Sequence, residues 1–114
     1  METKQRMIQE YVPGKQVTLL HIIASPQPSI YRSLGLDDAG ADAIGILTVT
    51  PGEAVIIAAD VATKAAEVQI GFLDRFGGAL VVFGDVASVA AAIAGVRAMF
   101  SDVLRFSVAE VTRS

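Results

Sequence analysis

The stretch "TPGEAVIIAADVATKAAEV", residues 50–68, predicts a helix more firmly than any other part of the chain. Thr50 and Glu53 have capping-box spacing, and Pro51 suits the first helical position. Polar residues at i, i+3, i+4 and i+7 would share one side of this helix: Asp60, Thr63, Lys64 and Glu67. The other side would largely carry Ile57, Ala58, Val61 and Ala65. We therefore expect an amphipathic helix.

Apolar segments flank this helix on both sides. "AIGILTV", residues 43–49, is typical of a buried strand. "VQIGFL" (68–73) and "ALVVFG" (79–84) predict two strands joined by the turn in "LDRFGG". Asp85 is expected to cap a second helix, "VASVAAAIAGVRAMF" (86–100). An aspartate before a helix can accept a hydrogen bond from a free backbone N–H of the first turn. Its many alanines would allow close approach to another helix or to the sheet.

Further elements are expected toward both ends of the chain. "KQVTLLHIIA" (15–24) predicts a strand, and a short helix fits between Pro26 or Pro28 and Gly35. The loop 36–43 contains Gly40, a candidate hinge, and "LRFSVAEVTR" (104–113) predicts a last strand. Residues 6–12 alternate weakly, as in a strand that pairs elsewhere. The central β-α-β-β-α-β order predicts an α+β, ferredoxin-like fold over residues 1–114, with an antiparallel sheet and helices on one face.

Composition narrows the class of protein. The 114 residues suit one domain, and 53% are hydrophobic while only 18% are charged. A small domain with so few charged and so many apolar residues is expected to bury surface outside its own core, most simply in contacts between subunits. The net charge of −3, without a basic cluster, argues against nucleic acid as a partner. The N-terminus has no signal-peptide pattern, and no apolar run reaches the roughly 18 residues of a membrane span. We expect a cytosolic protein with no membrane partner.

The residues that could carry chemistry are few. His21 is the only histidine, and its place among aliphatic residues favours a structural role with a hydrogen bond to backbone. Metal-ligand spacing is missing, and the residues around Gly14 and Lys15 do not complete a phosphate-binding loop. The adjacent acids Asp37 and Asp38 are typical of solvated loops, as the pair Asp74 and Arg75 is of a turn. No catalytic residue, metal or cofactor is predicted, so a binding or structural role is favoured.

Several longer segments of the sequence resemble one protein family. "YVPGKQVTL", "DAGADAIGILTVTPGE", "AADVATKAAEVQIGFLDRFGGALVVFGDV" and the closing "VTRS" are together similar to circularly permuted bacterial microcompartment (BMC) shell proteins of the EutS/PduU type. The resemblance covers nearly the whole chain. It implies a non-enzymatic homohexamer that tiles a shell in the bacterial cytoplasm. Its implied partners are other shell proteins and enclosed enzymes, such as those of ethanolamine or diol degradation.

The resemblance also implies roles for particular segments. Residues 15–114 would form the BMC core, with residues 15–35 as the permuted strand and helix. Residues 1–12 would supply one strand of a six-chain β-barrel over the sixfold axis, and its barrel residues would be Met7, Ile8, Gln9, Glu10, Tyr11 and Val12.

Two sites carry over from the family. The turn at Arg75, Phe76, Gly77 and Gly78 would line the central pore, where the bulky Phe76 departs from the ordinary pattern and would narrow the opening. Lys64 would lie at the hexamer edge, with Pro26 and Gln27 where the family often has an arginine. Without the resemblance, Lys64 would be interpreted as a solvated helix lysine paired with Asp60 or Glu67.

Two other classes of function remain open on the residues alone. A ferredoxin-like regulatory oligomer would bind a small molecule between its subunits, and that ligand would raise its stability. A small enzyme would use His21 and Asp74 and would lose turnover in His21→Ala.

Overall fold

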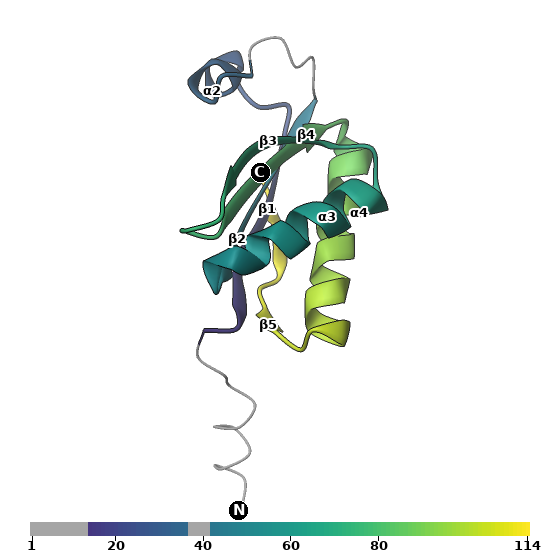
Figure 1. The fold of residues 1–114 in the computed structure, drawn as a ribbon. Coiled ribbons are helices and arrows are strands. Elements are labelled where there is room, and N and C mark those ends of the chain that lie inside the picture. The colour runs from purple at the N-terminus through teal and green to yellow at the C-terminus, as the bar shows by residue number, and fades with distance from the viewer. Residues whose placement is uncertain (1–13, 37–41) are drawn as a thin grey trace, which may run out of the picture.

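The protein folds into a twisted sheet with two helices packed on one face (Figure 1). The computed structural model describes residues 14–36 and 42–114. In chain order its strands and helices are β1 (Gln16–Ala24), α2 (Pro28–Ser33), β2 (Ala43–Thr50), the 3₁₀ turn η1 (Gly52–Ala54), α3 (Val55–Ala65), β3 (Gln69–Asp74), β4 (Ala79–Gly84), α4 (Val86–Ala98), the π-helical turn η2 (Met99–Val103), β5 (Ser107–Val108) and β6 (Val111–Arg113). This confirms the predicted α+β class and the central order of elements.

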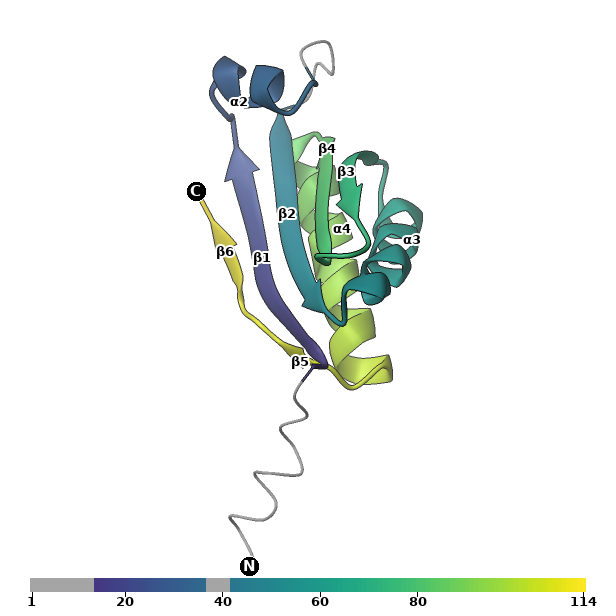
Figure 2. The same ribbon diagram turned by 60° about the vertical axis from the view of Figure 1, so that its left-hand side comes forward.

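The sheet is mixed rather than antiparallel. Its order is β3-β4-β2-β1, with β5 and β6 both on the free side of β1. The pairs β1–β2, β2–β4 and β3–β4 are antiparallel, whereas β5 and β6 run parallel to β1. The chain leaves η2 at the end of the sheet where β1 begins, so it can only return beside β1 in the same direction (Figure 2). The expected antiparallel sheet is therefore wrong for this edge.

The core lies between the sheet and helices α3 and α4. Alternate residues of the strands face this layer, and they pack against Val89, Ile93 and Phe100 of the α4–η2 segment. The expectation that all helices share one face is wrong for α2. Tyr31 of α2 and Leu36 after it pack on the opposite face, against Ile44, Val81 and Phe83.

Helix α3 begins later in the sequence than the capping-box spacing of Thr50 and Glu53 predicted. Thr50 is still the last residue of β2, paired with Gln16, and this extended pairing prevents it from capping a helix. Pro51 precedes η1, and α3 starts at Val55 without a side-chain cap. The polar side is exposed as predicted. The buried side is Val55, Ala58, Ala59 and Ala62, whereas Ile57 and Ala65 of the predicted apolar side are exposed.

Helix α4 agrees with its prediction at its start. The Asp85 side chain accepts a hydrogen bond from the Ser88 N–H at 2.7 Å. A Cβ added to Gly95 would lie 2.9 Å from the Cβ of Ala65, so α3 and α4 approach as closely as the small residues allow.

One helical segment contradicts the expectation that no apolar run is long enough for a membrane span. By length and composition, Val86–Val103 is long and apolar enough to cross a membrane. Its buried side packs in the core described above.

The end of the chain is two short strands rather than one long strand. Residues up to Val103 continue the helix as η2, and a positive φ of 62° at Arg105 turns the chain toward β5. Arg97 of α4 holds the turn between the strands, because its Nε donates to the Ala109 carbonyl at 2.9 Å and its guanidinium pairs with Glu110 at 3.3 Å. The sequence alone gave no sign of this contact.

Candidate functional site

The predicted pore turn is a tight hairpin between β3 and β4. The Oδ1 atom of Asp74 accepts hydrogen bonds from the N–H groups of Phe76 and Gly77, each at 3.0 Å. The Gly78 N–H donates to the Asp74 carbonyl at 2.8 Å. Asp74 is thus a turn-forming residue, as its place in the sequence predicted, and its carboxylate is engaged within the hairpin.

Two glycines allow this hairpin to pack against the end of β2 and the start of η1. Gly78 has a φ of +78°, and a Cβ there would overlap the carbonyl oxygen of Val49. The Gly78 carbonyl accepts from the Val49 N–H at 2.8 Å. A Cβ on Gly52 would overlap the carbonyl oxygen of Phe76. The sequence indicated the role of Gly78 but not that of Gly52, since a glycine after proline also fits a helix start.

The tip of the hairpin presents an aromatic ring and a charge. Phe76 is 84% exposed, the highest value among the large exposed apolar side chains of the described residues. The Arg75 guanidinium lies 5.0 Å from the centre of the Phe76 ring, within the range of a cation–π contact. Asp74 is bound to the turn backbone, so the tip itself carries the positive charge of Arg75.

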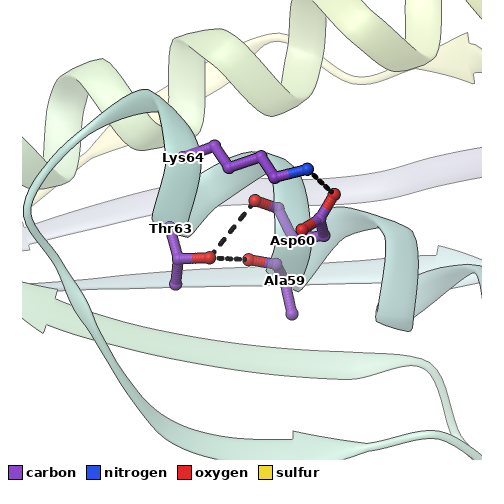
Figure 3. Close-up of polar contacts among 4 residues, drawn as sticks. All are labelled: Ala59, Asp60, Thr63 and Lys64. Carbon is purple, nitrogen blue, oxygen red and sulfur yellow. Dashed lines mark hydrogen bonds and ion pairs between the residues drawn. The ribbon is translucent and has the colours of Figure 1, made fainter.

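Lys64 lies in the last turn of α3 (Figure 3). Its Nζ atom is 3.0 Å from Oδ2 of Asp60, and both side chains are largely exposed. The neighbouring Thr63 hydroxyl donates to the Ala59 carbonyl at 2.8 Å. Within a single chain Lys64 therefore forms the solvated i, i+4 pair that the residues alone favoured. Such a pair contributes less than about 1 kcal/mol, so Lys64 can change partner at little cost.

Pro26 and Gln27 lie at the end of the sheet away from the hairpin. Gln27 precedes α2 and is exposed, with no side-chain hydrogen bond to the helix start, and its carbonyl accepts from the Ile30 N–H at 2.9 Å. α2 follows Ala24, whose partner Ala43 begins β2 at the opposite end from the hairpin. Figure 2 shows α2 and the β3–β4 hairpin at opposite ends of the sheet. The structure thus separates Pro26 and Gln27 from the predicted pore turn.

His21 is bound by hydroxyl groups rather than by backbone, so that detail of its prediction is wrong. Its Nδ1 lies 2.6 Å from the Thr112 hydroxyl, and its Nε2 lies 2.8 Å from the Ser114 hydroxyl. The Thr112 hydroxyl also contacts the Leu20 carbonyl at 3.3 Å. These contacts join β1 to the last residues of the chain, which agrees with the structural role that was favoured for His21.

Other predicted positions lie outside the described residues. These are the barrel residues Met7, Ile8, Gln9, Glu10, Tyr11 and Val12, the candidate hinge Gly40, and the acids Asp37 and Asp38. Among residues 14–36 and 42–114, no group of three or more His, Asp or Glu side chains could hold a metal ion.

Both candidate sites lie on the surface of a small α+β domain. Residues 43–112 match the BMC domain. The chain is 54% identical to the bacterial microcompartment shell protein PduU of Salmonella typhimurium, over 98% of this chain and 96% of PduU. It is 51% identical to the shell protein EutS of Escherichia coli, over 97% of this chain and 98% of EutS. The chain therefore belongs to the BMC domain family of microcompartment shell proteins.

Solved structures agree with this assignment. A flat hexamer of CutR superposes with a TM-score of 0.85 at 43% identity, over 91% of this chain and 94% of the CutR chain. A screw form of CutR gives 0.83 at 44% identity, over 90% and 100% of the two chains. A fused permuted hexameric shell protein of the RMM microcompartment gives 0.67 at 29% identity, over 82% of this chain and 49% of that protein.

Proposed function

We propose that the chain is a structural shell protein of a bacterial microcompartment, forming homohexameric tiles in the polyhedral shell within the bacterial cytoplasm. The observation that carries this proposal is the near full-length match to PduU and EutS, together with the close superposition on a hexameric CutR chain. Its role is structural rather than enzymatic, and family membership favours it over the regulatory oligomer. Its partners are further copies, other shell proteins and the enclosed enzymes, such as those of ethanolamine or diol degradation.

The β3–β4 hairpin is proposed to line the sixfold axis. Support comes from its rigid attachment to Val49 and Gly52 and from the nearly complete exposure of Phe76. Six phenylalanine rings near one axis would form an apolar constriction that restricts passage. The permuted order of elements, residues 1–12 as a barrel strand, and Gly40 as a hinge belong to the same proposal.

Lys64, Pro26 and Gln27 are proposed to lie at the hexamer edge. Pro26 and Gln27 lie at the end of the sheet opposite the hairpin, and a subunit with its hairpin at the axis directs that end outward (Figure 2). Lys64 lies in the last turn of α3, a helix that begins next to the hairpin, where Gly52 approaches Phe76. Lys64 would exchange Asp60 for backbone carbonyls of the neighbouring tile, while its stem covers apolar surface.

Two variants separate the edge role of Lys64 from its ion pair. Lys64→Ala should leave the hexamer mass unchanged by light scattering, and electron microscopy should show fewer sheets or tubes than for the wild type. Asp60→Ala removes the same ion pair but keeps the lysine, so it should still assemble. Equal loss of assembly in both variants would assign the effect to the ion pair, and dissociation of Lys64→Ala to monomers would contradict the edge placement.

A further inference from the structure

A cluster of three polar side chains lies where β6 pairs with β1, and the proposed shell role makes no use of it. Thr112 is the parallel partner of His21, and Ser114 follows two residues later, so both hydroxyls share one face of the sheet with the imidazole. The Nδ1 atom of His21 lies 2.6 Å from the Thr112 hydroxyl, and Nε2 lies 2.8 Å from the Ser114 hydroxyl. Hydroxyl groups therefore hold both ring nitrogens.

The hydrogen bonds around Thr112 determine which nitrogen of the ring carries the proton. A hydroxyl has a single proton, and that of Thr112 is donated to the Leu20 carbonyl at 3.3 Å. The Thr112 oxygen then accepts from the imidazole, which places the ring proton on Nδ1. Nε2 is left with its lone pair, so it accepts the hydroxyl proton of Ser114. This is the tautomer in which a histidine acts as a general base toward a serine.

The Ser114 hydroxyl is both fixed and accessible. The Ser114 N–H donates to the Ile22 carbonyl at 2.9 Å, and the Ser114 carbonyl accepts from the Ala24 N–H at 2.9 Å. These two bonds continue the pairing of β6 with β1 past Arg113, and they keep the serine beside Nε2 of His21 (Figure 2). Ser114 is exposed, whereas His21 is half-buried. A reagent in solvent can thus reach the serine oxygen while the base stays in contact with it.

The composition of the cluster sets the chemistry that it can support. Ser114 and His21 are a nucleophile and a base in contact, and the Thr112 hydroxyl orients the base. Thr112 is neutral, so it does not stabilise a charged imidazolium as a carboxylate would. The Ser114 N–H is already bound to Ile22, so it is not available to a tetrahedral oxyanion. The cluster therefore suits acyl donors with a good leaving group, and a single transfer rather than repeated turnover.

We propose that Ser114 is an acyl-acceptor site that takes one acyl group from an activated ester, with His21 as the general base and Thr112 as a positioning residue. The Ser114 oxygen forms a bond to the acyl carbon, and the bond from that carbon to the leaving oxygen breaks. The hydroxyl proton passes to Nε2 of His21, and the leaving group departs as its anion. Loss of that proton to solvent restores the neutral imidazole. This modification is additional to the shell role and does not depend on it.

The test is the acetylation of the full-length wild type by p-nitrophenyl acetate, located by mass spectrometry after an acid quench. Digestion after glutamate places Ser114 in the peptide 111–114, and fragmentation separates it from Thr112. Ser107 is the internal control, since it is an exposed serine of β5 at the same edge of β1, and His21 contacts Ser114 instead. Ser114 should be acetylated at least about tenfold faster than Ser107, because a positioned base contributes about 10²–10⁴-fold in complete sites. Equal rates at the two serines would overturn the proposal.

Substitutions at the other two positions test their assigned roles. His21→Gln keeps hydrogen-bonding groups but removes the base, so the rate at Ser114 should fall to that at Ser107. Thr112→Val removes the hydroxyl that orients the ring and should slow the reaction, whereas Thr112→Ser keeps a hydroxyl and should restore it. A wild-type rate at Ser114 in His21→Gln, or equal rates in Thr112→Val and Thr112→Ser, would contradict these roles. If circular dichroism shows that a variant is unfolded, the comparison of Ser114 with Ser107 in the wild type still decides.

Discussion

The hairpin end of this subunit and the opposite end, which carries α2, are both exposed, yet they are held in place very differently (Figure 2). The hairpin is fixed by two bonds to Asp74, by the contact of Gly78 with Val49, and by the approach of Gly52. Away from the hairpin, α2 has no buried residue, and Lys64 in the last turn of α3 has one exposed ion pair. A rigid end suits a surface that six chains must share, and an adaptable end suits contacts between separate tiles.

The strongest test of this contrast is Gly78→Ala. The new Cβ would overlap the Val49 carbonyl at a positive φ, so we expect a loss of at least about 3 kcal/mol in the free energy of unfolding. Gly35→Ala is the matched control, since Gly35 has a φ of +75° but open space around it, and it should cost about 1 kcal/mol. Urea denaturation of both variants measures the difference, and equal losses would contradict the close packing.

Asp74→Ala should have the next largest effect. It leaves the N–H groups of Phe76 and Gly77 without their carboxylate partner, at a cost of about 1–2 kcal/mol. Asp74→Asn keeps an oxygen at the accepting position and should lose much less. If both variants are equally destabilised in denaturant, the turn does not depend on this acceptor.

A smaller effect is expected in α2, at the end opposite the hairpin, when the pH is raised. Burial, and secondarily the charge of Asp42, raises the pKa of Tyr31 above its ordinary value of 10.0. The folded state therefore favours the neutral phenol. The contribution of this phenol to the free energy of unfolding is complete below about pH 10 and is lost as the pH rises through the folded-state pKa of Tyr31. The free energy of unfolding should fall less between pH 9 and about 11 in Tyr31→Phe than in the wild type. Identical pH profiles would show that the environment of Tyr31 has no such effect.

The smallest change in stability is expected for Lys64→Ala. Its pair with Asp60 is exposed on both sides, so the free energy of unfolding should stay within about 0.5 kcal/mol of the wild type. Thermal or urea denaturation at low and high salt would measure it. A larger loss would mean that Lys64 stabilises the single chain and is not free for another partner.

The features that could be predicted from the sequence are those set by neighbouring residues. The Asp85 cap, the glycine turn at Gly78 and the exposed side of α3 follow from local spacing and were predicted correctly. The late start of α3 was missed because sheet pairing of Thr50 outweighs its capping pattern. The parallel direction of β6 depends on where α4 ends relative to β1, which no local pattern contains.

The candidate sites were likewise predictable only where neighbouring residues determine them. The sequence indicated the hairpin residues Arg75–Gly78, because turn residues and glycines lie between two apolar segments. It could not indicate that Gly52 supports the hairpin, because this contact arises only when the start of η1 is brought against the β3–β4 turn.

The arrangement of the two ends in the assembly can be measured directly, because the chain contains no cysteine and accepts a single label. Spin labels attached in Phe76→Cys and, separately, in Lys64→Cys would give label-to-label distances between subunits by pulsed electron paramagnetic resonance. The account predicts distinctly shorter nearest-neighbour distances for the label at position 76 than for the label at position 64 within isolated hexamers. Longer distances at position 76 would contradict the placement of the hairpin at the sixfold axis.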